Sequence, residues 1–210
     1  SRDSVRLAFL IAALNDLDIL SADVQNAYLN APTKEKVYTT AGLEFGQENQ
    51  GRPAIIVRAL YGLKSSGARW RDHMAATLRG LKFSNCLADP DVWMKARTKA
   101  NGDKYWEYVL VYVDDLLIVS EDPKVTMDEL GKGYTLKTGS VKELDAYLGA
   151  EITKWKVDGD AREKWAMSSD LKVKRAIDYV LRDLFATGKG LTKKATTPVT
   201  VGYSPEMETS

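Results

Sequence analysis

Tyr108-Val-Leu-Val-Tyr-Val-Asp114-Asp115-Leu-Leu-Ile-Val-Ser120 is the stretch that decides the fold. Two adjacent carboxylates interrupt an otherwise apolar run. The flanks are β-branched and aromatic, which predicts two strands with the aspartates at the tight turn between them. Because a divalent cation relieves the repulsion between neighbouring acids, this hairpin tip is a candidate half of a two-metal site. A solvated Asp-Asp turn is the alternative interpretation, since aspartate is common in turns.

A further carboxylate ends a second short strand. Asp18–Asp23 is predicted to be a strand, and it follows a helix, Val5–Leu14, that is apolar along most of its length and is expected to be buried. Two-metal phosphoryl transfer needs carboxylates from separate strands to hold two Mg²⁺ ions about 3.5–4 Å apart. Asp23 together with the hairpin pair would supply that arrangement. The alternative is that Asp23 is a surface or helix-capping acid.

Several short motifs occur in order along the chain. They are Asp23-Val-Gln-Asn-Ala-Tyr-Leu-Asn30, Val37-Tyr38, Leu60-Tyr-Gly-Leu-Lys64 with Trp70, Tyr112-Val-Asp-Asp115 and Tyr147-Leu-Gly-Ala-Glu-Ile152. In this order, the chain resembles the reverse transcriptase of copia-type LTR retrotransposons over nearly its whole length. The resemblance implies an RNA-dependent DNA polymerase domain of a retrotransposon polyprotein.

The pattern of elements indicates an α+β fold, and it is similar to the palm of a right-hand polymerase with the fingers largely missing. The acids would lie on an antiparallel sheet, with the helix Val5–Leu14 and an amphipathic helix, Ser65–Leu81, covering the back of that sheet. Ser65 or Ser66 is the expected helix cap. The other expected strands and helices are Pro53–Arg58, Asp91–Lys95, Tyr105–Val113, Leu116–Ser120, a helix opened by Pro123, Tyr134–Lys137, Tyr147–Lys156 and a helix over Ser169–Phe185.

Three segments are expected along the chain. Residues 1–155 would form the palm with partial fingers. Residues 156–187 would form a hairpin and a helix at the start of a thumb or connection region. Residues 188–210 are rich in Gly, Thr, Lys and Pro and are expected to be loosely ordered.

The resemblance implies a role for each matched residue. The catalytic, metal-binding residues would be Asp23, Asp114 and Asp115 with Val24, and the cofactor two Mg²⁺ ions, with Mn²⁺ as a possible substitute. Val24, Gln25, Asn26 and Ala27 lie where the family holds the triphosphate with backbone N–H groups. Tyr28 matches the aromatic ring that excludes a 2′-hydroxyl, although a core aromatic is the alternative. The implied nucleic-acid contacts are Tyr112, Val113, Tyr147, Leu148 and Gly149.

The motif around Lys64 departs from its family. Lys64 and Ser65 mark the entry to the helix behind the nucleotide, and Ser65 stands where the family has a Gln that contacts the dNTP near its sugar. Arg69 is shifted by one position from the usual Arg. Lys137 is a candidate for the basic residue that protonates the leaving pyrophosphate, the alternative being a solvent-exposed strand lysine. The loss of the family Gln at position 65 predicts a lower catalytic efficiency.

Composition limits the other possibilities. The net charge is +1, which argues against a protein that holds nucleic acid by bulk charge alone. A single cysteine, Cys86, excludes an internal disulfide and a cysteine-cluster metal site. The basic segment with Lys172, Lys174, Arg175 and Arg182 is either a solvated helix face or a contact to a template–primer backbone.

The implied partners are an RNA or DNA template with its primer, and dNTPs. No apolar run is long enough to cross a membrane, so no membrane partner is expected. Family members also carry an upstream fingers segment, an RNase H domain and an integrase in the same polyprotein, and these are expected to be absent from this sequence. A catalytically inactive transposon remnant that binds nucleic acid at most weakly is the alternative function.

Overall fold

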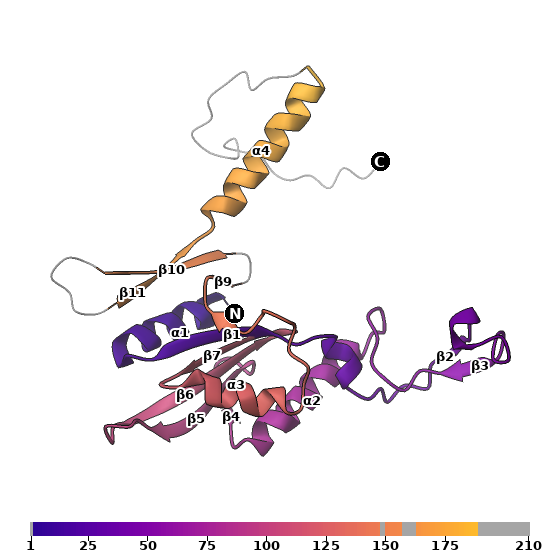
Figure 1. Cartoon of the computed structure of the whole chain (residues 1–210), viewed down its shortest axis with the longest axis horizontal. Helices are drawn as coiled ribbons and strands as arrows, with labels where there is room; N and C mark the ends of the chain where they lie inside the picture. The colour runs from indigo at the N-terminus through magenta and orange to yellow at the C-terminus, as the bar shows by residue number, and fades with distance from the viewer. Residues whose placement is uncertain (1, 148–149, 157–162, 189–210) are drawn as a thin grey trace.

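A six-stranded antiparallel sheet forms the centre of the computed structural model, which describes residues 2–147, 150–156 and 163–188 (Figure 1). Its strand order is β4-β5-β6-β7-β1-β8. The bounds are β1 Asp18–Asp23, β4 Ser84–Asn85, β5 Val92–Thr98, β6 Lys104–Tyr112, β7 Asp115–Ser120 and β8 Lys142–Glu143. The predicted α+β class is confirmed.

Helices cover both faces of this sheet. Along β7, Leu116 and Ile118 share a core with α2 (Ser66–Gly80) and α3 (Pro123–Gly131), whereas the alternate residues Leu117 and Val119 share a core with α1 (Arg2–Asn15). Because successive strand residues point to opposite faces, α1 and α2 lie on opposite sides of the sheet. The expectation that both cover the same face was wrong. Burial on both faces also explains why β7 reads as a continuous apolar run.

Helix α1 is packed between two sheets (Figure 1). On its far side lies a three-stranded sheet of β9 (Ala146–Tyr147), β10 (Ala150–Lys156) and β11 (Glu163–Ser168). Phe9 of α1 stacks on Trp165 of β11, with ring centroids 5.9 Å apart. The sequence predicted a buried helix, but α1 is buried only in part, because the side chains of Leu7, Leu10 and Leu14 are exposed.

Two predicted strands have a different structure. Residues 134–137 form no strand, and their contact with the sheet is an isolated bridge between Val24 and Leu136. Tyr147–Lys156 is not one strand but the pair β9 and β10, joined through residues 148–149, which lie outside the described part. The expected boundary at 155/156 falls inside the β10–β11 hairpin, whose strands pair from Glu151↔Ser168 to Lys156↔Glu163.

The remaining elements lie at the periphery. Strands β2 (Tyr38–Thr40) and β3 (Pro53–Ile55) form a small hairpin away from the sheet (Figure 1). Short 3₁₀ helices are η1 (Ala27–Asn30) and η2 (Leu43–Phe45). The predicted C-terminal helix is confirmed as α4 (Asp170–Ala186), which projects from the end of β11 and buries none of its residues. The expected tail falls from residue 189 onward outside the described residues. Within the described ranges, no helix has the length and apolar character needed to cross a bilayer.

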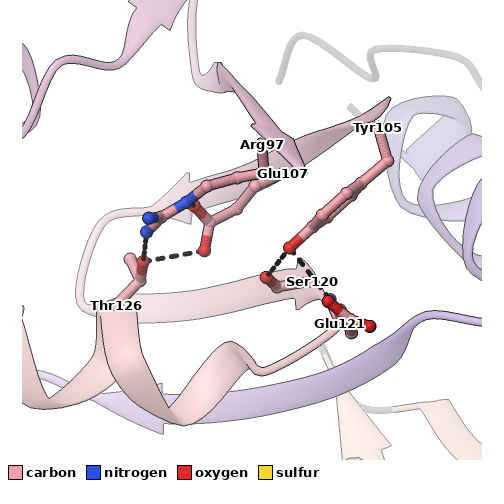
Figure 2. A network of polar contacts seen from close by, with 6 residues as sticks. All are labelled: Arg97, Tyr105, Glu107, Ser120, Glu121 and Thr126. Carbon is pink, nitrogen blue, oxygen red and sulfur yellow. Dashed lines mark hydrogen bonds and ion pairs between the residues drawn. The ribbon is translucent and has the colours of Figure 1, made fainter. Parts of the chain in front are cut away.

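A buried polar network joins β5 and β6 to the start of α3 (Figure 2). Glu107 on β6 is only 1% exposed, and its carboxylate accepts hydrogen bonds from Arg97 Nε at 2.7 Å and Thr126 Oγ1 at 2.7 Å. Nearby, the hydroxyls of Tyr105 and Ser120 lie 2.9 Å apart. Because both carboxylate oxygens of Glu107 have partners, its charge is stabilised inside the fold.

Replacing Arg97 with Met is expected to lower the free energy of unfolding by about 3 kcal/mol, since it leaves the Glu107 carboxylate buried without its cation. Urea denaturation of the two proteins measures the loss. Arg71→Met is the matched control, because the Arg71–Asp91 ion pair is exposed on both sides and should be worth less than about 1 kcal/mol. Equal losses in the two variants would contradict this account of the network.

Candidate functional site

Asp23 and Asp115 are direct neighbours across the β1–β7 pair. They are Cα partners in the antiparallel register. The preceding and following residues, Ala22 and Leu116, point into the core of α2 and α3, so both carboxylates project from the opposite face of the sheet. Asp114 immediately precedes Asp115 in the turn. The structure therefore brings the three predicted carboxylates to one end of the sheet.

The turn that carries Asp114 has a strained backbone. Val113 has a φ of +56°, a left-handed conformation that is rare for a β-branched residue. Trp70 of α2, 2% exposed, donates its indole Nε1–H to the Val113 carbonyl at 2.6 Å. The backbone N–H of Val24 donates to the Asp114 carbonyl at 2.8 Å. These two bonds fix the turn from both sides, so α2 and the end of β1 together set the position of Asp114.

The sequence did not reveal this role of Trp70. The tryptophan appeared there only as part of a motif, and its partner lies 43 residues away in the chain. A tryptophan in a buried helix position needs an acceptor for its N–H, which is the one sequence signal that could have prompted a search for its partner.

Burial and neighbouring charges act together on Asp115. Loss of hydration raises the pKa of its carboxyl most, the charges of Asp114 and Asp23 raise it further, and Lys137 opposes them. Repulsion among the crowded acids thus acts on the pKa of Asp115, although burial contributes more. Lys137 Nζ lies 3.5 Å from Asp23 Oδ2, and the Lys137 backbone N–H donates to the Asp23 carbonyl at 2.8 Å. The predicted basic residue therefore lies beside the acids, although not on a strand.

The donor atoms at this end of the sheet fit a hard divalent cation. Aspartate carboxylates are the oxygen ligands that Mg²⁺ and Mn²⁺ prefer. A bound cation would also offset the repulsion between Asp115 and the two neighbouring acids. Two backbone hydrogen bonds flank the bridge between Val24 and Leu136, and the Val24 carbonyl is the acceptor in neither of them. Among the described residues, no three His, Cys, Asp or Glu side chains are close enough to hold one ion. The ligand types at this end of the sheet therefore fit Mg²⁺, but the described side chains do not converge on a single ion.

Two of the four predicted triphosphate donors are already engaged. The N–H of Val24 bonds Asp114, as described, and that of Gln25 donates to the Thr135 carbonyl at 2.9 Å. Asn26, with a left-handed φ of +51°, stands at the start of η1, and Ala27 is the first residue of that helix. Tyr28 is half-buried and packs against the core shared by α2 and α3.

The predicted cap of α2 is confirmed in position but not in its hydrogen bonding. Ser65 occupies the N-cap position but caps nothing with its side chain, and its buried hydroxyl has no hydrogen-bond partner among the described residues. Ser66 Oγ instead donates to the Leu60 carbonyl at 2.5 Å. Lys64 is exposed. Arg69 lies 3.4 Å from Asp72 on the same helix.

The predicted nucleic-acid contacts divide into exposed and buried residues. Tyr112 and Val113 are exposed at the hairpin tip. Tyr147 is 5% exposed and packs in the core beside α1, so a contact from this residue to nucleic acid would have to use its backbone. Leu148 and Gly149 lie outside the described residues.

Residues 1–160 match the family model described as reverse transcriptase (RNA-dependent DNA polymerase). The chain belongs to the reverse transcriptase family. The match covers all three carboxylates, the strained turn and α2, so the site described above lies within the family's own domain.

Curated relatives of this reverse transcriptase chain are transposon proteins. It is 30% identical over 152 residues to the retrovirus-related Pol polyprotein from transposon RE1 of Arabidopsis thaliana, a match over 70% of this chain and 10% of that polyprotein. It is 31% identical over 134 residues to the putative transposon Ty5-1 protein of Saccharomyces cerevisiae, over 62% of this chain and 41% of that protein. For the polyprotein from transposon TNT 1-94 of Nicotiana tabacum, the identity is 27% over 181 residues, 83% of this chain and 13% of the relative.

These relatives confirm the predicted resemblance to copia-type elements. The chain spans about a tenth of the length of the plant polyproteins that it matches.

Replacing Asp115 with Asn is expected to raise the free energy of unfolding at pH 7 in EDTA. A carboxyl whose pKa is raised by folding binds its proton more tightly in the folded state. Its ionisation therefore destabilises the fold once the pH rises above the pKa of an unfolded aspartate. The gain should shrink as pH falls and the wild-type carboxyl is protonated. Thermal unfolding from pH 4 to pH 8 measures it, and a variant less stable than wild type at pH 7 would mean that Asp115 is structural.

Replacing Trp70 with Phe should cost about 1–2 kcal/mol of unfolding free energy, because the ring remains while the Val113 carbonyl loses its donor. Urea denaturation measures the loss. Trp106→Phe is the matched control, since Trp106 is half-exposed on β6 and its loss should stay within about 0.5 kcal/mol. Equal losses of unfolding free energy in Trp70→Phe and Trp106→Phe would show that the indole hydrogen bond does not hold the turn.

Proposed function

We propose that this chain forms the palm of a right-hand polymerase and carries out RNA-templated DNA synthesis by two-metal nucleotidyl transfer. The observation that carries the proposal is the pairing of Asp23 with Asp115 across β1 and β7, with Asp114 on a turn locked by two hydrogen bonds. Carboxylates from two strands and a turn at one sheet end are what such a reaction requires.

In this reaction the primer 3′-oxygen attacks the α-phosphorus of a dNTP and pyrophosphate leaves. Asp23 and Asp114, with the Val24 carbonyl, would hold two Mg²⁺ ions, and Asp115 would lie close to them. When bound, the ions would lower the pKa of the attacking hydroxyl and would neutralise charge on the leaving group. Lys137, whose Nζ lies beside Asp23, would give a proton to the leaving pyrophosphate oxygen.

The nucleotide would lie against η1. The N–H groups of Val24 and Gln25 are engaged and Ala27 is fully buried, so the exposed Asn26 is the backbone donor left for the triphosphate. Tyr28 would form the wall against the sugar, where a ring clashes with a 2′-hydroxyl and so favours deoxynucleotides.

The protein would need few contacts to the base edges of the nucleic acid, because the template selects each incoming base by pairing. Tyr112 and Val113, exposed at the hairpin tip, would contact the primer end. The lengths of the plant relatives support a domain that works inside a polyprotein. An RNase H domain and an integrase would be its partners there.

A catalytically inactive remnant is the second candidate function. It is favoured by Ser65, which replaces the glutamine of the family pattern and whose hydroxyl has no hydrogen-bond partner among the described residues. Such a protein would keep the fold and bind nucleic acid weakly.

Asp114→Asn should abolish primer extension on poly(rA)/oligo(dT) with Mg²⁺ while leaving the fold intact, because it removes one metal-ligand charge at the turn. Asp128→Asn, an exposed change on α3, is the matched control and should extend like wild type. Extension by the Asp114 variant at the wild-type rate would overturn the site assignment. Absence of extension in all three proteins would support the inactive remnant.

A further inference from the structure

The segment Leu60-Tyr-Gly-Leu-Lys64 forms a tight turn with a fixed conformation. The Leu63 N–H donates to the Leu60 carbonyl at 3.2 Å, and Gly62, the third residue of the turn, has a φ of +99°. This is the pattern of a type II turn. A Cβ at Gly62 would meet nothing within 4 Å, so the glycine is needed for its backbone angle and not for space.

The start of α2 anchors this turn. Ser66 donates its hydroxyl to the Leu60 carbonyl at 2.5 Å and its N–H to the Leu63 carbonyl at 3.2 Å. Ser66 is itself buried. Tyr61, the second residue of the turn, is therefore presented from a rigid support.

Tyr61 lies on the ring of Tyr28. The ring centroids are 4.4 Å apart and the ring planes are inclined by 37°. Tyr28 also packs against the core of α2 and α3, whereas Tyr61 is 65% exposed. The Tyr28 ring is thus held between the core and a second ring, and the outer ring faces solvent.

Tyr28 lines a pocket together with Tyr112 and Val113, the two residues before Asp114, so the stack lies near the turn that carries this acid. Partial loss of hydration raises the pKa of the Tyr61 hydroxyl, followed by the charge of Asp114, the neighbouring Tyr28 and the charge of Asp23. The charges of two of the three acids therefore act on the hydroxyl of this exposed ring.

We propose that Tyr61 is a specificity-determining residue of the nucleotide site: it holds the Tyr28 ring in position, so that the two rings exclude a ribose as one unit. This inference rests on the proposed function. A steric wall discriminates only if it cannot turn away from the added hydroxyl. Without Tyr61, the half-buried Tyr28 ring has support from the core on one side alone.

A double-mutant cycle on the 210-residue chain tests this coupling. Wild type, Tyr28→Ala, Tyr61→Ala and the double variant are each titrated with thymidine triphosphate and with its ribose counterpart, 5-methyluridine triphosphate, in the presence of Mg²⁺ and primer–template. Tyr61→Ala should reduce the preference for the deoxynucleotide about tenfold. It should have no further effect in the Tyr28→Ala background, because residues that act as a unit are not additive.

Two further variants separate positioning from general stability. Tyr61→Phe keeps the ring and should keep the preference. Gly62→Ala keeps both tyrosines but strains the turn, and it should also lower the preference. Melting temperatures of all variants are recorded alongside.

The outcomes distinguish this inference from the proposed function. If Tyr61→Ala keeps the wild-type preference, or if the two single effects multiply in the double variant, the inference fails while the nucleotide site stands. If wild type binds neither nucleotide, the nucleotide site fails, and the role of Tyr61 fails with it.

Discussion

The register of β1 against β7 is the constraint on which the site depends. It places Asp23 opposite Asp115 and, through the same ladder, aligns Ile19 with Val119 inside the core. Because side chains alternate along a strand, a slip of one residue would turn Asp23 to the other face and would also move Ile19 out of its place in the core beside α1. Burial of the core therefore enforces the pairing of the two acids. The fold protects the geometry of the site through residues that never touch it.

Helix α2 has a double part in this arrangement. Trp70, in its second turn, donates to the carbonyl of the strained residue Val113, and its first residue, Ser66, anchors the turn that carries Tyr61. A left-handed β-branched residue is tolerated only where the surroundings over-determine its conformation. The helix thus supports both the carboxylate turn and the aromatic stack, and a shift of its N-terminal end would be felt at both places.

The parts that sequence could predict are those with a local signal. The hairpin around Asp114 follows from its β-branched flanks, and α3 follows from Pro123 at a helix start. The sequence could not predict which side of α1 is buried, because Leu7, Leu10 and Leu14 look the same in sequence whether they are buried or exposed. Non-local bonds have no sequence pattern at all. The indole bond of Trp70 and the stacking of Tyr61 on Tyr28 depend on segments brought together only by the folded sheet.

The place of α1 between two sheets also bears on the order in which the protein can form. A chain is synthesised from its N-terminus, so α1 leaves the ribosome before any strand that covers it. One of its faces must wait for β6 and β7, and Phe9 must wait longer still, until Trp165 has been made. Contacts of such large sequence separation fold slowly, and the helix remains an exposed apolar segment in the meantime. Nascent chains that stop before β11 would then be the forms most prone to aggregate or to recruit chaperones.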